Sequence, residues 1–330
     1  MRVGATLRAA SAGAVAAAAF DVLAWRRRRQ RVERAFRRAP TSRGPVPYLD
    51  LGPRDGPVVL FSPGGGSGVD LVHAYPWLPA AGYRVISVSR PGYYGVPLSG
   101  ADDPGTQADL YAEVLSSTGV RGPVHVFGVS AGGPAALLHA ARHPTRSLVL
   151  WCAVTGPYAP ASAAVESPLG RLVLSPRGQV LLSWLLARTT RAAPAFALTS
   201  FLRTESSLDA AAIREVARYV HGDDAQRESF AALIDSTTPM SRLYPGMMDE
   251  LRAFAEPWRV PWSQIRAPVL AVHSEADGDV PVAHVERLRA ELPDARVLTP
   301  RAGGHLVWLG PEGPSVVRAT LDHLAAADDG

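Results

Sequence analysis

The sequence predicts an α/β fold in which a mostly parallel central sheet carries helices on both faces and a helical segment is inserted as a lid. Two patterns predict it. From residue 45 to residue 154, short apolar runs alternate with helical ones, and the alternation resumes from residue 269 onward. Residues 155–262, between them, lack that alternation. With 330 residues, 47 % of them hydrophobic, the chain can bury a sizeable core.

The first half of the fold is predicted as short strands separated by helices. Residues 45–51 and 58–62 are expected to form a hairpin around the turn at 52–56. After residue 62, predicted strands and helices alternate, and each strand–helix–strand succession implies a right-handed crossover between parallel strands. Buried strands are expected at 83–89, 124–129 and 148–154, and helices at 70–81, 107–118 and 131–142.

After the gap, strands are expected at 269–273 and 296–299, and helices at 282–292 and 314–326. Residues 44–154 and 263–330 are therefore assigned to one α/β core, and residues 155–262 to an insertion. Helical stretches with wide apolar faces are expected in the insertion at 173–186, 195–202, 208–220 and 225–234. Such an insertion indicates a lid that closes an apolar pocket, and ordinary helix packing against the core is the alternative.

The first 43 residues differ from the rest. Residues 9–25 are mostly alanine and are followed at once by the sequence RRRRQR. A helix over this run reaches about 26 Å, slightly short of a bilayer core, and Asp21 within it adds a cost in lipid. Three interpretations stay open: a marginal signal anchor with its arginine side in the cytoplasm, a helix lying on anionic lipid, or a solvated tail.

Charge also separates residues 1–43, called the arm below, from the rest of the chain, called the body. Residues 1–43 carry eleven Arg against Asp21 and Glu33, a net charge of +9, and the rest of the chain carries −5. A nucleic-acid groove on the body is therefore not supported, and the partner considered for the arm is an anionic membrane surface. We expect a cytoplasmic protein whose membrane contact, where it has one, is made through the arm. Because the pattern of the fold begins after Pro40, we expect deletion of residues 1–40 to leave the fold intact.

The strongest chemical motif is G-V-S-A-G at residues 128–132, between a predicted strand and a predicted helix. A serine on so sharp a turn has a strained backbone, and the strand and helix approach too closely for side chains at positions 128 and 132. Glycine occupies both positions. The turn also places the Ser130 hydroxyl at a helix N-terminus, where free N–H groups favour developing negative charge. Ser130 is therefore predicted to be a nucleophile.

With this motif the chain resembles the α/β-hydrolase family, in its esterase- and lipase-like branch with a lid, over residues 45–328. That family takes an oxyanion-hole N–H from a glycine-rich loop, commonly H-G-G; residues 62–68 here read S-P-G-G-G-S-G and lack the histidine. The resemblance implies an oxyanion hole built from the backbone N–H of Ala131 and that of Gly64 or Gly65. Residues 90–95, R-P-G-Y-Y-G, are similar to the family's R-P-G-x-G loop and are expected to shape the pocket floor.

A serine hydroxyl needs a base, and the family's order of serine, acid and histidine puts the base after the last strand. His305 follows two glycines there and is the predicted general base. The acid has three candidates, Glu275, Asp277 and Asp279, and the resemblance to the family loop G-x-x-D-x-x-V-P assigns Asp277, which would orient His305. Asp279 is better explained as an N-terminal cap or dipole partner of the next helix, and Glu275 as a solvated charge.

Neither a cofactor nor a metal is expected. The single cysteine, Cys152, leaves no CxxC motif and is interpreted as a small buried hydrophobe. His139 and His143 are one helical turn apart but lack a third ligand, and are interpreted as surface histidines.

Together, Ser130, Asp277 and His305 predict a serine hydrolase that acts through an acyl-enzyme on a small to medium apolar carboxylic ester, a small-molecule substrate. Other chemistry of the same residues stays open: amidase or aminopeptidase, thioesterase, carbon–carbon bond hydrolase, perhydrolase or acyl transfer. A noncatalytic α/β-hydrolase-like protein that binds a small hydrophobic ligand is the alternative from another class.

Overall fold

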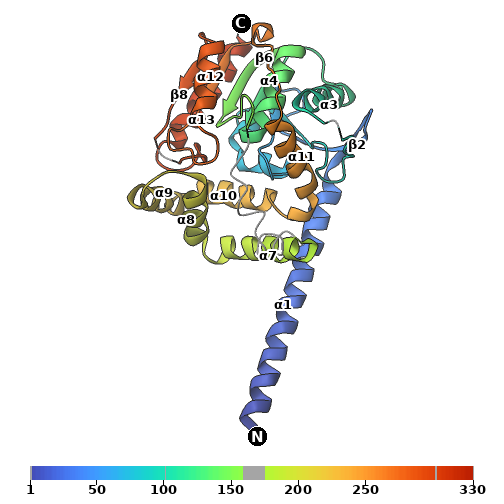
Figure 1. Ribbon diagram of the computed structural model, residues 1–330, viewed down its shortest axis with the longest axis vertical. Helices are drawn as coiled ribbons and strands as arrows, with labels where there is room; N and C mark the ends of the chain where they lie inside the picture. Colours follow the sequence, from blue (N-terminus) through green and yellow to red (C-terminus); the bar gives the residue numbers. More distant parts are fainter. Residues whose placement is uncertain (1, 101, 159–174, 302, 330) are drawn as a thin grey trace.

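The computed structural model of the chain describes residues 2–100, 102–158, 175–301 and 303–329, and for residues 2–15 it describes the helical backbone alone. In this part of the chain a sheet forms the centre, helices cover both of its faces, and a further group of helices lies across one end of it (Figure 1). This is the predicted α/β fold.

The sheet of the described residues contains β1 (Arg37–Thr41), β2 (Gly44–Leu51), β3 (Val58–Ser62), β4 (Arg84–Val88), β5 (Val124–Val129), β6 (Thr145–Trp151), β7 (Val269–Val272) and β8 (Arg296–Leu298). Their order in space is β1-β2-β4-β3-β5-β6-β7-β8. From β4 to β8 in that order the strands are parallel, whereas β1 and β2 are antiparallel to their neighbours. The carboxyl ends of the parallel strands therefore meet at one edge, where ligands of such sheets bind.

The hairpin predicted from residues 45–51 and 58–62 is wrong. β2 pairs instead with β4, Tyr48 lying opposite Val88, and β4 separates β2 from β3. The hairpin partner of β2 is β1, in which Arg37 lies opposite Tyr48. The pairing of β2 with β4 joins segments that are distant in the sequence, and the turn residues between β2 and β3 carry no information about it.

Helices cover the two faces of the sheet. α3, α4 and α12 pack on one face around Leu110, Leu137 and Leu288, and α2 and α13 pack on the other around Leu78 and Leu324. The helices are α1 (Arg2–Ala35), α2 (Trp77–Ala80), α3 (Pro104–Ser117), α4 (Gly133–Arg142), α7 (Pro176–Ala192), α8 (Pro194–Glu205), α9 (Ala210–Gly222), α10 (Asp224–Ser236), α11 (Tyr244–Ala255), α12 (Ala283–Glu291) and α13 (Gly313–Asp328), with short 3₁₀ turns η1 (Val69–Ala74), η2 (Ser130–Gly132), η3 (Met240–Arg242) and η4 (Trp262–Gln264).

The helix predicted at 70–81 is divided into η1 and α2. Pro76 separates the two pieces and Pro79 follows within α2. Neither proline has an N–H to donate, so a continuous α-helical ladder cannot form through this stretch.

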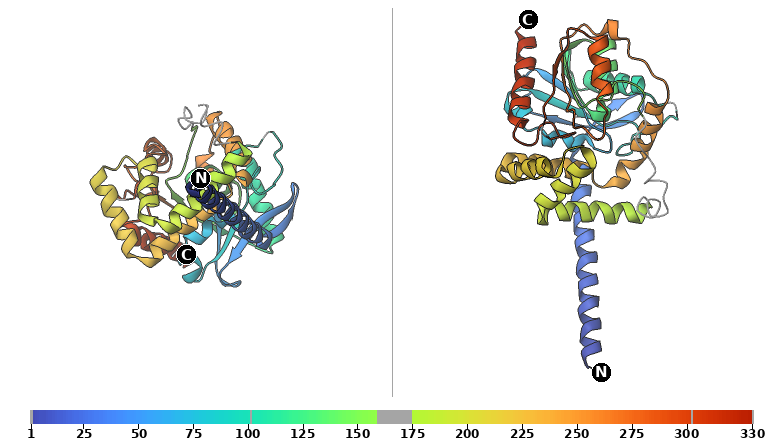
Figure 2. Two further views of the ribbon diagram at one scale, coloured as in Figure 1. Left: turned by 90° about the horizontal axis from the view of Figure 1, so that it is seen from below. Right: turned by 60° about the vertical axis from the view of Figure 1, so that its left-hand side comes forward.

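The insertion is a group of helices, α7 to α11, and its described residues, 155–158 and 175–262, are called the cap below. The helical stretches expected at 173–186, 195–202, 208–220 and 225–234 correspond to α7, α8, α9 and α10, although residues 173 and 174 lie outside the described residues. Leu202 and Phe230 of the cap share one apolar cluster with Trp308 of the core. The cap is therefore packed onto the carboxyl edge of the sheet as a layer of the same molecule (Figure 2).

The arm is partly built into this fold. α1 projects far beyond the body in Figures 1 and 2, but Trp25 in its last turns is only 1 % exposed, and Phe36 directly after it is 6 % exposed. The guanidinium of Arg29 pairs with Asp70 at 2.7 Å, and β1 is an edge strand of the sheet. The expectation that residues 1–40 can be deleted without harm is therefore contradicted by the packing: that deletion removes two buried aromatic side chains and most of an edge strand.

Among the helices of the described residues, none is both long enough and apolar enough to span a bilayer.

Replacing Phe36 tests whether the end of the arm belongs to the cooperative fold. We expect Phe36→Ala to lower the free energy of unfolding by about 3 kcal/mol, because a buried ring that meets Tyr94 edge-on at 5.1 Å is lost. Phe20→Ala, at a position 71 % exposed on α1, is the matched control and should change it by less than about 0.5 kcal/mol. Urea unfolding of the full-length variants measures both, and equal values would show that the arm unfolds independently.

Candidate active site

Four loops at the carboxyl edge of the sheet carry the residues singled out by the sequence. Gly64 and Gly65 follow β3, and Ser130 follows β5 directly. Asp277 lies in the loop after β7, and His305 lies in the loop after β8. Ser130, His305 and both glycines line one cavity of about 310 Å³, so the structure brings together residues separated by as many as 241 positions in the chain.

The backbone of Ser130 is left-handed, with a φ of 52°, which a residue with a side chain adopts at a cost. The two neighbouring glycines explain how the turn is accommodated. A Cβ at Gly128 would lie 2.6 Å from that of Ala136, and a Cβ at Gly132 would lie 2.2 Å from the carbonyl oxygen of Ser62. Strand and helix thus approach as closely as the motif predicts, and α4 begins three residues after the serine.

The glycine-rich loop lies against this turn. A Cβ at Gly64 would be 3.5 Å from the Cβ of Ser130, and one at Gly65 would be 3.1 Å from the Cβ of Ala131. The backbone of the loop therefore borders both the serine and the residue after it. Amides of Gly64, Gly65 and Ala131 are near enough to the serine for the oxyanion role that the family resemblance implies.

A buried arginine holds this loop. Arg90, 1 % exposed, donates hydrogen bonds to the carbonyl oxygens of Pro63 and Gly64, the second at 2.9 Å. Its Nε is 2.7 Å from Oε1 of Glu250 on α11 of the cap, a carboxylate that also accepts from Tyr93 at 2.6 Å. Burial raises the pKa of Glu250, an effect that the Arg90 charge opposes. The sequence analysis expected only that the loop at 90–95 shapes the pocket floor and missed the arginine's contact with the oxyanion loop.

Asp277 and His305 form a hydrogen-bonded pair. Nδ1 of His305 lies 2.9 Å from Oδ2 of Asp277 and 3.0 Å from Oδ1. Oδ1 also accepts from the backbone N–H of Asp279 at 2.9 Å and of Val280 at 3.0 Å. Burial alone would raise the pKa of Asp277, but the hydrogen bonds from His305 and the backbone hold it below its usual value. Burial alone would lower the pKa of His305, but the Asp277 carboxylate holds it well above 6.5.

The second ring nitrogen of His305 faces another carboxylate. Nε2 lies 3.8 Å from Oδ2 of Asp279, whose other oxygen accepts from the Tyr158 hydroxyl at 2.6 Å. Ser130 and His305 both belong to the described residues, and no hydrogen bond joins them; such catalytic bonds are often long before substrate binds.

The assignment of Asp279 as a helix cap is wrong. α12 begins at Ala283, its N-cap residue is Val282, and no side chain caps it. The carboxylate of Asp279 is instead turned to the cavity, which it lines together with Tyr158 and Glu205. Glu275 is exposed, as a solvated charge should be.

The cap is tied to the loops that carry the acid and the histidine. The carbonyl oxygen of Glu205, at the end of α8, accepts from the backbone N–H of Gly278 at 3.1 Å and of His305 at 3.3 Å. A Cβ at Gly304 would lie 2.2 Å from that of Ser206, so the approach is close enough to require glycine. This end of the cap is therefore fixed in place beside His305.

The cavity walls are mostly apolar. Tyr75 is fully buried, and its hydroxyl has no hydrogen-bond partner among the described residues. Burial raises the pKa of that hydroxyl well above 10, so it remains a neutral donor. Apolar lining comes from the core and from the cap alike: Leu71, Val129, Val154, Phe201, Leu233, Met247, Leu251, Leu306 and Trp308.

Among the described residues, three side chains could offer metal ligands at one place: Cys152, Asp277 and His305, whose ligand atoms lie within 4.8 Å of one another. Asp277 and His305 are already bonded to each other. Cys152 is buried, as expected, and burial raises the pKa of its thiol to about 11. The interpretation of His139 as a surface residue is wrong, because it is 1 % exposed and burial lowers its pKa to about 4.

Comparison with known proteins agrees with the fold. The sequence matches the Alpha/beta hydrolase family over residues 58–318, most of the chain. The chain therefore belongs to this family and is a hydrolase of the α/β fold with esterase-like relatives.

Particular relatives extend this finding. An uncharacterized hydrolase of Bacillus subtilis, YcgS, is 26 % identical over 268 residues, which cover 78 % of this chain and 87 % of the relative. A pimeloyl-(acyl-carrier protein) methyl ester esterase of Aromatoleum aromaticum is 31 % identical over 252 residues, which cover 73 % and 88 %. A solved structure, an alpha/beta hydrolase fold protein from Nakamurella multipartita, is 27 % identical with a TM-score of 0.78 and covers 90 % of this chain and 100 % of its own.

The contact of Arg90 with the glycine-rich loop generates a prediction. Arg90→Lys keeps a positive charge beside Glu250 but cannot donate to both loop carbonyls, because an ammonium lacks the planar fork of a guanidinium. We expect the maximal rate of hydrolysis to fall about tenfold, since the glycine-rich loop beside Ser130 would lose its fixed position. Steady-state kinetics measure it, with Arg54→Lys, at an exposed arginine, as control. An unchanged maximal rate in folded Arg90→Lys would refute the positioning role.

Proposed function

We propose that the chain is a serine hydrolase that cleaves a small to medium apolar carboxylic ester through an acyl-enzyme. The observation that carries the proposal is the 2.9 Å contact between His305 and Asp277, in which His305 lines the same cavity as Ser130, a serine with a left-handed backbone. A carboxylate at Nδ1 fixes the histidine tautomer in which Nε2 is free to accept a proton. The serine begins η2, the 3₁₀ turn that leads into α4, and the N-terminus of a helix favours developing negative charge.

The proposed reaction has two halves. Ser130 Oγ attacks the ester carbonyl while His305 Nε2 takes the hydroxyl proton, and backbone N–H groups of Ala131 and of Gly64 or Gly65 bind the resulting oxyanion. The intermediate collapses to an acyl-serine as His305 gives its proton to the leaving alcohol. Water then attacks the acyl-serine with His305 again as base, which releases the carboxylic acid and restores the serine.

The choice of an ester rests on the cavity and on the relatives. Apolar side chains of core and cap surround the serine, so an apolar acyl or alcohol group would bury its surface there. The relative from Aromatoleum aromaticum is named for a methyl ester, which favours ester over amide hydrolysis in this chain. The cap would act as the predicted lid, with its α8 end held beside His305.

A reactivity measurement separates this proposal from a noncatalytic ligand-binding protein. We expect a fluorophosphonate probe to label the wild-type chain once, and Ser130→Ala to abolish both labelling and ester turnover, because the probe needs an activated serine. A panel of esters and amides of graded chain length measures turnover. Absence of labelling in the folded wild type, or labelling that survives in Ser130→Ala, would exclude Ser130 as the nucleophile.

The two carboxylates beside His305 are predicted to differ. Asp277→Asn should lower turnover by roughly three to four powers of ten, because an amide at Nδ1 permits the wrong tautomer. Asp279→Asn should change turnover by no more than about fivefold, because its side chain is 35 % exposed and its pairing with Nε2 is screened by water. Kinetics on one ester substrate compare them directly. A dead Asp279→Asn beside an active Asp277→Asn would reverse the assignment of the acid.

A further inference from the structure

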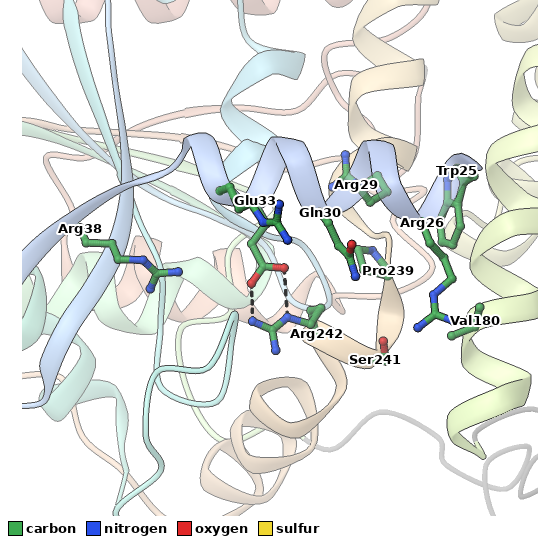
Figure 3. Close-up of a pocket in the computed structure, with 11 residues that line it drawn as sticks. Trp25, Arg26, Arg29, Gln30, Glu33, Arg38, Val180, Pro239, Ser241 and Arg242 are labelled. Atoms are coloured by element: carbon green, nitrogen blue, oxygen red, sulfur yellow. Dashed lines mark hydrogen bonds and ion pairs between the residues drawn. The ribbon is translucent and has the colours of Figure 1, made fainter. Parts of the chain in front are cut away.

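A second cavity, of about 340 Å³, lies outside the proposed active site, on the flank of α1 where this helix enters the body. Its walls come from α1, from Arg38 of β1, from α7 of the cap and from the segment at η3, and it shares no lining residue with the active-site cavity. Figure 3 shows Arg26, Arg38 and Arg242 among the side chains that line it. We call this cavity the basic pocket.

Positive charge dominates the lining of the basic pocket. Glu33 is the one acidic side chain that lines it, and its carboxylate accepts from Arg242, as the dashed lines in Figure 3 show. Within the described part of the chain, no carboxylate pairs with the other exposed arginines of the lining, which are Arg26, Arg34 and Arg38. Guanidinium groups in such excess match phosphate, whose oxygens accept their forked hydrogen bonds.

Two buried donors of the lining also lack a partner. Trp25 is 1 % exposed and Arg29 is 8 % exposed, and neither Nε1 of the tryptophan nor Nε of the arginine has a hydrogen-bond acceptor among the described residues. Leaving a buried donor unsatisfied costs about 1–3 kcal/mol. Both nitrogens are closed off from solvent, so a ligand in the pocket does not reach them in this structure, and the exposed arginines are what point to an anionic ligand.

Apolar side chains border the basic pocket. On α1, Phe20 is 71 % exposed and Leu23 is 50 % exposed, immediately before the pocket residue Trp25. On α7, Leu181 and Leu185 are 51 % and 45 % exposed, immediately after the pocket residue Val180. Such exposed leucines and phenylalanine would bury their surface in an apolar medium.

Contacts of Asp21 fix α1 against α7 at this place. Its carboxylate accepts from Nε1 of Trp184 at 2.8 Å and from Nε of Arg188 at 2.6 Å. The two helices cross here, beyond the sheet, in both views of Figure 2. The exposed apolar residues of each helix lie within three positions of these contacts, and the aspartate that would oppose a helix crossing in lipid is instead used to join the arm to the cap.

We propose that the basic pocket binds the phosphate of an anionic phospholipid, and that α1 and α7 thereby dock the protein on a bilayer surface. A lipid supplies both chemistries that meet at this place: a phosphate for the exposed arginines, and acyl chains for the exposed leucines. A second copy of the chain fits less well, because two arginine-rich pockets would repel each other. The proposal does not depend on Ser130 or on the chemistry of the cavity beside it.

Vesicle binding by the full-length chain tests the pocket with a matched pair of variants on α1. Arg26→Gln with Arg34→Gln removes two arginines that line the pocket; Arg27→Gln with Arg28→Gln removes two exposed arginines of the same helix that do not. Binding to phosphatidylcholine vesicles with and without phosphatidylglycerol is measured by sedimentation. We expect binding to require phosphatidylglycerol. We expect the variant without Arg26 and Arg34 to lose about ten times more affinity than the variant without Arg27 and Arg28, because an arginine hydrogen-bonded to a phosphate contributes more than one attracted to the membrane only through its charge.

Three results would overturn the proposal. Equal weakening by the two pairs would mean that the arm adsorbs by charge alone. Retained vesicle binding in Leu181→Ser with Leu185→Ser would exclude α7 from the docking surface. Binding of inorganic phosphate without binding to either vesicle would identify a soluble phosphate as the ligand, and a dimer that forms through the pocket without vesicle binding would identify a second copy. Unchanged urea-unfolding midpoints of all variants would show that they are folded, and this control does not depend on the activity proposed for Ser130.

Discussion

The close approach of β5 and α4 around Ser130 is the constraint on which the site depends. The left-handed backbone at this serine is possible only because Gly128 and Gly132 leave no side chain between the strand, the helix and the carbonyl of Ser62. The same approach puts the glycine-rich loop after β3 next to the loop after β5, since β3 and β5 are paired in parallel. Backbone strain at one residue is thus held by the packing of three elements, which is how rigid sites keep a costly conformation.

A buried ion pair extends this constraint to the cap. Arg90 joins two carbonyls of the glycine-rich loop to Glu250 on α11, and both charged side chains are almost fully buried. Burying charges is costly unless each is paired and hydrogen-bonded, as they are here through Tyr93 and Gln107. Placement of α11 and geometry of the loop are therefore coupled, and the cap is a structural part of the proposed site as well as a cover for it.

The positions of residues in local sequence patterns were predicted better than contacts between distant segments of the chain. The turn at Ser130 and the position of His305 after two glycines are local patterns, and the structure has both residues lining one cavity. β4 pairs with β2 and β3 across intervening elements, so a hairpin read from the turn at 52–56 was wrong. Glu250 lies 160 positions after Arg90, and the sequence around neither residue predicts their contact. Burial of Trp25 was not predicted either, because alanine and arginine dominate the sequence around it and give no apolar pattern for a buried segment.

The two carboxylates beside His305, those of Asp277 and Asp279, differ in how strongly their charges act on the imidazole ring. Asp277, with a side chain 1 % exposed, is held by two backbone N–H groups and the imidazole, so its charge acts on Nδ1 with little screening. Asp279, 35 % exposed, lies 3.8 Å from Nε2, where its charge favours the imidazolium but is weakened by water. Both charges favour the protonated ring, and a base must be neutral before it can accept a proton. A carboxylate as buried at Nε2 as Asp277 is at Nδ1 would favour the protonated ring still more, so the exposure of Asp279 limits how strongly the two carboxylates together oppose the proposed role of His305 as a base.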